Sequence, residues 1–270
     1  MAAARSLSSR MGSFCNHSAP ILNLILDAAE QMPKIDVPAL TGFSMSETSP
    51  TMRGEVSDIV VLQTGNGMTY SFFATVSRMK YIRRWALMRS TREENLSEHS
   101  LEVAMIAHAL CVIGNVRYGK NLDGERAALI GLYHDAPEII TGDMPTPVKY
   151  GNAAIRDAYR EVEAEAEHLL LDRLPEDLRK AYEDILETNA EQDEKEVYLR
   201  RLVKAADKLS ALIKCIEEEG SGNQEFRSAR VTTEKALEVM AAELPEVADF
   251  QRDFLPAYGK TLDELTEEPS

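Results

Sequence analysis

From residue 68 onward, apolar positions recur at the three- and four-residue spacing of amphipathic helices. The segment "YSFFATVSRMKYIRRW" (70–85), for example, carries apolar residues at positions 72, 73, 76, 79 and 82, as one face of a helix requires. Strand-like alternation is nearly absent after residue 68. The pattern therefore predicts an all-α domain, a single bundle of about seven helices over residues 68–270.

Cap residues and helix breakers divide this pattern into separate helices. Ser97 is expected to cap a helix that ends at Gly114, and Asp123 is expected to cap one that runs to Gly142. Further helices are expected in "AAIRDAYREVEAEAEHLLLDRL", "PEDLRKAYEDILET", "DEKEVYLRRLVKAADKLSALIKCIEEEG" and "QEFRSARVTTEKALEVMAAEL".

The first 67 residues do not follow the helical pattern. Residues 1–20 contain Arg5 and Arg10 but no acidic residue, a composition like that of an organellar transit peptide. A disordered tail, or sequence upstream of the true start, explains the same composition. The break "TGNG" directly precedes Met68. We expect a poorly structured extension at 1–67, a folded domain at 68–270, and a cytoplasmic protein unless residues 1–20 direct it to an organelle.

Charge and composition narrow the function. The net charge of −15 argues against binding of nucleic acid polymers, which need a basic surface. An anionic small molecule would need positive charge supplied locally, by a metal ion or a few Arg and Lys side chains. No segment approaches the roughly 20 apolar residues of a membrane span. The three cysteines lie far apart and form no CxxC pair, which indicates reduced thiols.

The stretch "LYHDAPEIITGDMPTPVKY" (132–150) places three carboxylates close to a histidine. On a helix, His134 and Asp135 point about 100° apart, so both can reach one ion. Glu138 lies one turn further along the same face. Gly142 then breaks the helix and Asp143 opens a proline-containing loop. The helix end and the loop can therefore surround one pocket.

Two further residues are candidate metal ligands. His99 lies in the first turn of a predicted helix, and Asp207 lies in the middle of another, among alanines and a leucine. Because an isolated buried charge is very costly, a cation near Asp207 would relieve that cost. With His134 and Asp135, these residues form a mixed nitrogen and oxygen set that suits Mn, Fe, Co or Zn.

Simpler interpretations of the same residues remain open at this point. Asp207 fits an ordinary amphipathic helix in which it is paired with Lys208 or Arg201. Glu138 fits an exposed helix face, and Trp85, the single tryptophan, fits a core position. The residue pattern alone does not separate these interpretations from a metal site.

Four sequence blocks resemble the bacterial YfbR-like 5′-deoxynucleotidases, which belong to the HD-domain superfamily of metal-dependent phosphohydrolases. The blocks are "IRRWALMR" (82–89), "SEHSL" (97–101), "YHDAPEIITGDMPTPVKY" (133–150) and "KAADKLSALIKCIEEEGSGNQEF" (204–226). They occur in the family's order, and the resemblance covers residues 68–270. One departure is Ala86, where the family pattern "RWPL" has proline.

The resemblance implies a mononuclear site and a role for each matching residue. The implied ligands of one divalent transition metal ion (Co, Mn, Zn, Cu or Fe) are His99, His134, Asp135 and Asp207. The implied substrate-binding residues are Arg84, Trp85, His99, Asp135, Asp143, Met144, Pro145 and Thr146. Glu138 and Asp143 are the implied catalytic residues.

The function implied by the resemblance is hydrolysis of deoxyribonucleoside 5′-monophosphates to deoxyribonucleosides and phosphate by a homodimer. Trp85 would pack against the sugar and disfavour a 2′-hydroxyl, although Ala86 makes that selection less strict. The expected partners are a small nucleoside 5′-monophosphate and a second copy of the chain, with no nucleic acid polymer and no membrane. The alternatives are an HD-domain phosphohydrolase of guanosine polyphosphates or cyclic dinucleotides, and a non-catalytic nucleotide-binding module.

Overall fold

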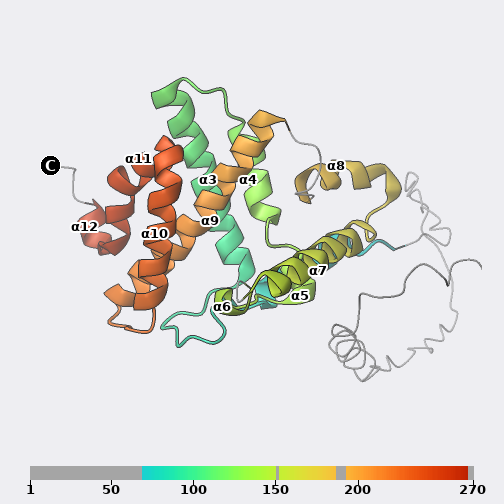
Figure 1. Cartoon of the computed structure of the whole chain (residues 1–270), viewed down its shortest axis with the longest axis horizontal. Helices are drawn as coiled ribbons and strands as arrows, with labels where there is room; N and C mark the ends of the chain where they lie inside the picture. The colour runs from blue at the N-terminus through green and yellow to red at the C-terminus, as the bar shows by residue number, and fades with distance from the viewer. Residues whose placement is uncertain (1–68, 150–151, 187–192, 267–270) are drawn as a thin grey trace, which may run out of the picture. The chain divides into compact units, whose positions relative to one another are not determined.

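The fold is all-α, as predicted. The structure, a computed structural model, describes residues 69–149, 152–186 and 193–266. Within these ranges the chain forms helices joined by loops, and no β-strand is present (Figure 1). The extension predicted at 1–67 lies outside the described residues.

One group of helices packs around the two longest ones. These are α3 (Leu96–Tyr118) and α9 (Glu194–Gly220), which lie against each other and against α4 (Gly124–Tyr133). The helices α10 (Arg227–Glu243) and α11 (Pro245–Asp253) cover the other side of α9 and the far end of α3 (Figure 1). The 3-10 helix η2 (Leu255–Gly259) and α12 (Leu262–Thr266) complete this group. Leucine, isoleucine and valine side chains from α3, α4, α9, α10 and α11 form one buried cluster.

A second group of helices contributes most of a separate apolar cluster. It comprises α2 (Phe72–Val76), η1 (Ser77–Tyr81), α5 (Glu138–Thr141), α6 (Thr146–Lys149), α7 (Ala153–Leu171) and α8 (Glu176–Leu186). The buried side chains of this cluster include Phe72, Ala136 and Leu170. The two clusters approach each other at the turn after α4, because Ile130 belongs to the first and Ala136 to the second.

The ends of α3 differ from the prediction. Its N-cap is Asn95, not Ser97, and Asn95 forms a capping box with Glu98. The helix continues through Gly114 to Tyr118 and ends at Gly119, which has φ 63°. A Cβ at Gly114 would lie 2.7 Å from Leu122 Cδ1. Gly114 therefore permits close packing and does not end the helix.

The helix predicted from Asp123 to Gly142 is interrupted. Residues 134–137 form a turn between α4 and α5, so His134 and Asp135 do not lie on a regular helix as predicted. Pro137 explains the break, because its ring clashes with the carbonyl four residues earlier and it has no amide hydrogen. The predicted helix over 70–85 likewise ends early, at Tyr81, and an isolated β-bridge then joins Arg83 to Asn95.

The composition of α3 also differs from expectation. By length and apolar content, Leu96–Tyr118 is a candidate membrane span, although no such segment was expected. One such helix is weak evidence, because core helices have the same composition, and its most apolar part is 56% buried inside the domain. Its contacts with α4, α9 and α11 account for this composition.

Candidate metal and nucleotide site

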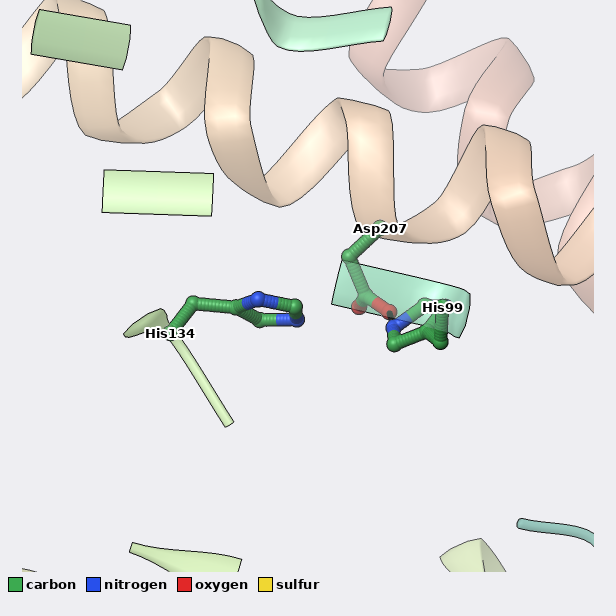
Figure 2. Close-up of side chains that lie close together, drawn as sticks. All are labelled: His99, His134 and Asp207. Carbon is green, nitrogen blue, oxygen red and sulfur yellow. Dashed lines mark ion pairs between the residues drawn. The ribbon is translucent and has the colours of Figure 1, made fainter. Parts of the chain in front are cut away.

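The four predicted metal ligands meet where α3, α9 and the turn after α4 converge. Ligand atoms of His99, His134 and Asp207 all lie within 4.8 Å of one another, and Figure 2 shows these side chains facing one another. Asp135 Oδ2 lies 3.4 Å from His99 Nε2 and 3.1 Å from His134 Nε2. The structure thus brings all four residues to one point, although they are spread over more than 100 positions of the sequence.

The turn at 134–137 aims His134 into the site. His134 Nδ1 lies 2.8 Å from the Gly131 carbonyl oxygen. Because a carbonyl only accepts, Nδ1 carries the proton and donates it. In the neutral ring, Nε2 is then the nitrogen with a free lone pair, and it faces Asp135. The turn, and not the predicted helical face, therefore directs His134 and Asp135 toward the same site.

The donor set fits a metal ion. The Nε2 atoms of His99 and His134 are buried and neither makes a hydrogen bond. His99 Nε2 lies 3.3 Å from Asp207 Oδ1 and 3.4 Å from Asp135 Oδ2. Two unsatisfied ring nitrogens facing two carboxylates are costly in a buried site. One divalent transition metal ion would satisfy all four groups.

The pKa values of these groups are strongly coupled. Burial lowers the pKa of His134, but Asp135 reverses this effect and raises the pKa to about 9. Burial works against ionised Asp135, yet His134 and His99 bring its pKa well below the ordinary value. Burial has the same effect on Asp207, whose pKa is nevertheless lowered by His99 and Lys208. Both carboxylates therefore stay ionised near neutral pH, as metal binding requires.

Arg84 and Trp85 lie beside the predicted metal ligands, in the segment that follows η1. Arg84 Nη2 lies 3.9 Å from Asp207 Oδ1, and Arg84 Nη1 donates to Glu94 Oε1 at 2.6 Å. The indole Nε1–H of Trp85 donates to the other oxygen of Glu94 at 3.1 Å, and its backbone N–H donates to Asp143 Oδ2 at 3.1 Å. Trp85 has a φ of 59°. Glu94 and Asp143 together stabilise this uncommon backbone conformation.

Glu94 is a site residue that sequence reasoning missed. One of its oxygens binds Arg84 and the other binds Trp85. It precedes α3 and lies outside every helical pattern. The sequence evidence that points to Glu94 is its position between the "IRRWALMR" and "SEHSL" blocks.

Glu138 and Asp143 lie on the α5–α6 side of the site. Glu138 begins α5, is 8% exposed, and its Oε2 has no hydrogen-bond partner. Burial and the negative charges of Asp135 and Asp143 raise the pKa of Glu138 to about 9. Burial also raises the pKa of Asp143, although Arg84 and the Trp85 amide oppose the rise. Glu138 is therefore the carboxyl group most able to hold a proton near neutral pH.

The remaining predicted substrate residues follow Asp143. Met144 and Pro145 are half-buried in the segment between α5 and α6, and Thr146 begins α6. The Thr146 side chain lies outside the described part of the structure.

Polar side chains at the end of α9 and just beyond it hold the segment that follows Arg84 and Trp85. Glu218 is 1% exposed and accepts hydrogen bonds from the Thr91 amide and hydroxyl, both at 2.8 Å. Lys214 donates to Glu218 at 2.5 Å and to the Arg92 carbonyl at 2.6 Å. Asn223 donates to Glu218 at 2.8 Å. Sequence reasoning assigned Lys214, Glu218 and Asn223 no role, although all three lie in the "KAADKLSALIKCIEEEGSGNQEF" block (204–226).

Comparison with solved structures identifies the fold. An HD-domain phosphohydrolase from Listeria innocua superimposes with a TM-score of 0.61 at 22% identity, covering 70% of this chain and 88% of that one. The helical fold is therefore that of the HD-domain phosphohydrolases.

The family follows from sequence. Residues 71–258 match the family described as 5′-deoxynucleotidase YfbR-like. The 5′-deoxynucleotidase of Erwinia tasmaniensis is 46% identical over 197 residues, which cover 73% of this chain and 96% of that protein. The 5′-deoxynucleotidase YfbR of Shigella flexneri is also 46% identical, with the same coverage. This chain belongs to the YfbR-like 5′-deoxynucleotidase family, as the sequence blocks predicted.

Proposed function

We propose that this protein is a metal-dependent 5′-deoxynucleotidase, which hydrolyses deoxyribonucleoside 5′-monophosphates to deoxyribonucleosides and phosphate. The observation that carries the proposal is the juxtaposition of Arg84 with the four predicted metal ligands. Its Nη2 lies 3.9 Å from Asp207 Oδ1. A phosphate bound there would contact both a guanidinium and a metal ion. The names of the related proteins agree with this substrate class.

His99, His134, Asp135 and Asp207 would hold the metal ion. When bound, the ion would supply an activated water and would neutralise charge on the phosphoryl group. The candidate ions are Co, Mn, Zn, Cu and Fe.

Arg84 binds and orients the phosphate. Burial alone would lower the pKa of its guanidinium, but the charges of Glu94, Asp135 and Asp207 raise the pKa. Its charge is therefore permanent. Glu94 holds one side of the guanidinium at 2.6 Å. The other side is directed toward the predicted metal site, where it can donate to phosphate oxygens.

Glu138 is the proposed proton donor to the departing 5′-oxygen of the nucleoside. Its pKa is raised to about 9, so the carboxyl is protonated near neutral pH, as a general acid requires. Asp143 accepts the backbone N–H of Trp85 at 3.1 Å. Asp143 thus holds the segment that places the indole, and we propose that the indole packs against the deoxyribose and disfavours a 2′-hydroxyl. Met144, Pro145 and Thr146 would border the nucleotide on the Asp143 side.

The predicted homodimer is part of the proposal. Four apolar side chains on α3 are exposed at spacings of four, seven and four residues, as one helical face requires. They are Leu101, Met105, Val112 and Val116. A second copy of the chain could cover this face. The predicted cytoplasmic location, with an organelle as the alternative, depends on residues outside the described ranges and stays a prediction.

A substrate panel tests the proposal. Metal-stripped protein would be assayed before and after addition of Mn²⁺ or Co²⁺ on deoxy- and ribonucleoside monophosphates, guanosine polyphosphates and cyclic dinucleotides. We expect metal-dependent release of phosphate from deoxyribonucleoside monophosphates. Hydrolysis of only the polyphosphates or cyclic dinucleotides would contradict it.

The matched variant for this panel is Glu138→Ala. We expect it to fold and bind metal like the wild type, while turnover falls by about 10²–10⁴-fold, the usual contribution of one general acid or base. Turnover at the wild-type rate would remove Glu138 from the mechanism.

A further inference from the structure

The Nδ1 side of the His99 ring, which faces away from Asp135 and Asp207, makes contacts that the reaction does not use directly. His99 Nδ1 lies 2.9 Å from Ser210 Oγ. The Ser210 hydroxyl in turn donates to Glu102 Oε2 at 2.6 Å, a length typical of a hydroxyl bound to a carboxylate. The His99 side chain is fully buried and Ser210 is 0% exposed.

The arrangement of the two helices explains why these residues meet. Glu102 lies three residues after His99 on α3, and Ser210 lies three residues after Asp207 on α9. On a helix, residues three apart share one face. The contact between α3 and α9 therefore brings together two pairs, His99 with Asp207 on the metal side and Ser210 with Glu102 on the other.

The number of protons available on each group determines which atom donates in each hydrogen bond. A serine hydroxyl has one proton, and a carboxylate only accepts. Because Ser210 gives its proton to Glu102, its oxygen must accept from His99, and Nδ1 must therefore carry a hydrogen. The next carboxylate oxygen, Glu94 Oε1, lies 3.6 Å from Nδ1, beyond hydrogen-bond range. It is already bound to Arg84.

We infer that Ser210 and Glu102 are positioning residues that hold His99 as the Nδ1–H tautomer, so that Nε2 presents its lone pair to the metal ion. Without them, the proton would move to Nε2, because two carboxylates face that nitrogen at 3.3 and 3.4 Å. A ring protonated at Nε2 cannot bind the metal. The inference rests on the proposed function, since it assumes that the site takes a metal ion.

The test measures metal affinity and the His99 tautomer in the full-length protein. Zn²⁺ and Mn²⁺ would be titrated in competition with a chelator. In Ser210→Ala and Glu102→Ala we expect binding weaker by about 10–100-fold, the usual effect of removing a partner of a metal-binding histidine. Glu102→Gln should bind metal within about twofold of the wild type, because its amide oxygen still accepts from Ser210.

Ser100→Ala is the matched control. Ser100 is the neighbour of His99 on α3, is also buried, and its hydroxyl has no hydrogen-bond partner. Its removal should leave metal affinity unchanged. Equal weakening in Ser100→Ala and Ser210→Ala would overturn the inference, because any lost buried hydroxyl would then have the same effect.

The His99 tautomer is read from ¹⁵N spectra of metal-stripped protein. The chain has five histidines, so His99 can be assigned by substitution. We expect Nδ1–H in the wild type and a substantial Nε2–H population in Ser210→Ala. Wild-type metal affinity or an unchanged tautomer in Ser210→Ala would overturn the inference. If the wild type bound no metal, the proposed function itself would fail, so the two failures are distinguishable.

Discussion

The metal-binding half and the nucleotide-binding half of this site rest on different kinds of structure. In the metal-binding half (His99, His134, Asp135 and Asp207), two of the four ligands lie on the long helices α3 and α9. In the nucleotide-binding half (residues 82–95 and 138–149), the chain is mostly irregular or forms single helical turns.

The contacts that hold the two halves differ accordingly. The α3–α9 contact is apolar, with Leu110, Leu202 and Leu209 all 0% exposed. Because this packing fixes the register of α3 against α9, it also fixes where His99 lies relative to Asp207. Residues 82–95 are instead held by carboxylates. Glu94 accepts hydrogen bonds from Arg84 and Trp85, and Glu218 accepts them from the amide and the hydroxyl of Thr91. Polar contacts, and not apolar packing, therefore position residues 82–95 of the nucleotide-binding half.

The largest expected effect comes from Glu138, where the two halves face each other. In the folded metal-stripped protein its pKa is about 9, against an ordinary value of 4.5. The unfolded chain therefore loses this proton at lower pH than the folded protein does. The free energy of unfolding should fall as pH rises from 4.5 to 9, by at most about 1.4 kcal/mol per pH unit.

Urea unfolding at several pH values between these limits measures the slope. His134 contributes in the same direction above its ordinary pKa of 6.5, because its folded pKa is also about 9. The comparison with Glu138→Gln isolates the carboxyl, and this variant should have the flatter profile. Equal slopes in both proteins would show that burial and the charges of Asp135 and Asp143 do not raise the pKa of Glu138.

Glu218→Ala should have the next largest effect. It leaves the Lys214 ammonium, whose side chain is 7% exposed, without its charged partner. It also leaves the Thr91 amide without an acceptor. Breaking a buried ion pair typically costs about 3–5 kcal/mol, and we expect a loss of that size in the free energy of unfolding, measured with urea.

The same variant should affect only the nucleotide-binding half of the site. Metal affinity of the folded Glu218→Ala protein should equal that of the wild type, while the KM for the nucleotide rises. A matching loss of metal affinity would show that the two halves are not independent.

Glu94→Gln should have a smaller effect, confined to the nucleotide. The amide keeps one acceptor but loses the charge that holds Arg84 at 2.6 Å. A hydrogen bond to a charged group contributes about 1.5–3 kcal/mol, so kcat/KM should fall by about 10–100-fold, with less discrimination between deoxyribose and ribose. Glu93→Gln is the matched control, because Glu93 pairs with Arg83 and both side chains are largely exposed. A similar loss in both variants would contradict a specific role for Glu94.

The difference between the halves also explains what the sequence could predict. His99 and Asp207 are predicted ligands because of their places on two helices and the resemblance of the blocks around them, and the structure places them on the two longest helices. The geometric prediction for His134, Asp135 and Glu138 assumes an unbroken helix. The structure has a turn at residues 134–137 instead, and this turn still brings His134 and Asp135 beside His99. Helical spacing thus predicted the all-α fold, the resemblance supplied the full set of predicted metal ligands, and neither predicted the turn at residues 134–137.

Glu94 and Glu218 could not be found from local patterns. Glu218 lies 127 positions from Thr91, which it contacts, and nothing in the helical periodicity of α9 marks it as a hydrogen-bond acceptor. Glu94 precedes a helix and belongs to no repeating pattern. Their roles depend on tertiary contacts that only the folded chain defines.

The smallest expected effect comes from Glu225→Gln, which is the matched counterpart of Glu218→Ala. Glu225 binds Arg89, in the same segment that Glu218 holds, with distances of 2.9 Å to Nε and 2.5 Å to Nη2. The Arg89 side chain, however, is 91% exposed, and exposed ion pairs contribute about 0–1 kcal/mol. We expect a loss of less than about 1 kcal/mol in urea unfolding and an unchanged KM. If Glu225→Gln instead destabilised the protein as much as Glu218→Ala, negative charge and not burial would hold this segment, and the distinction between the two halves would lose its physical basis.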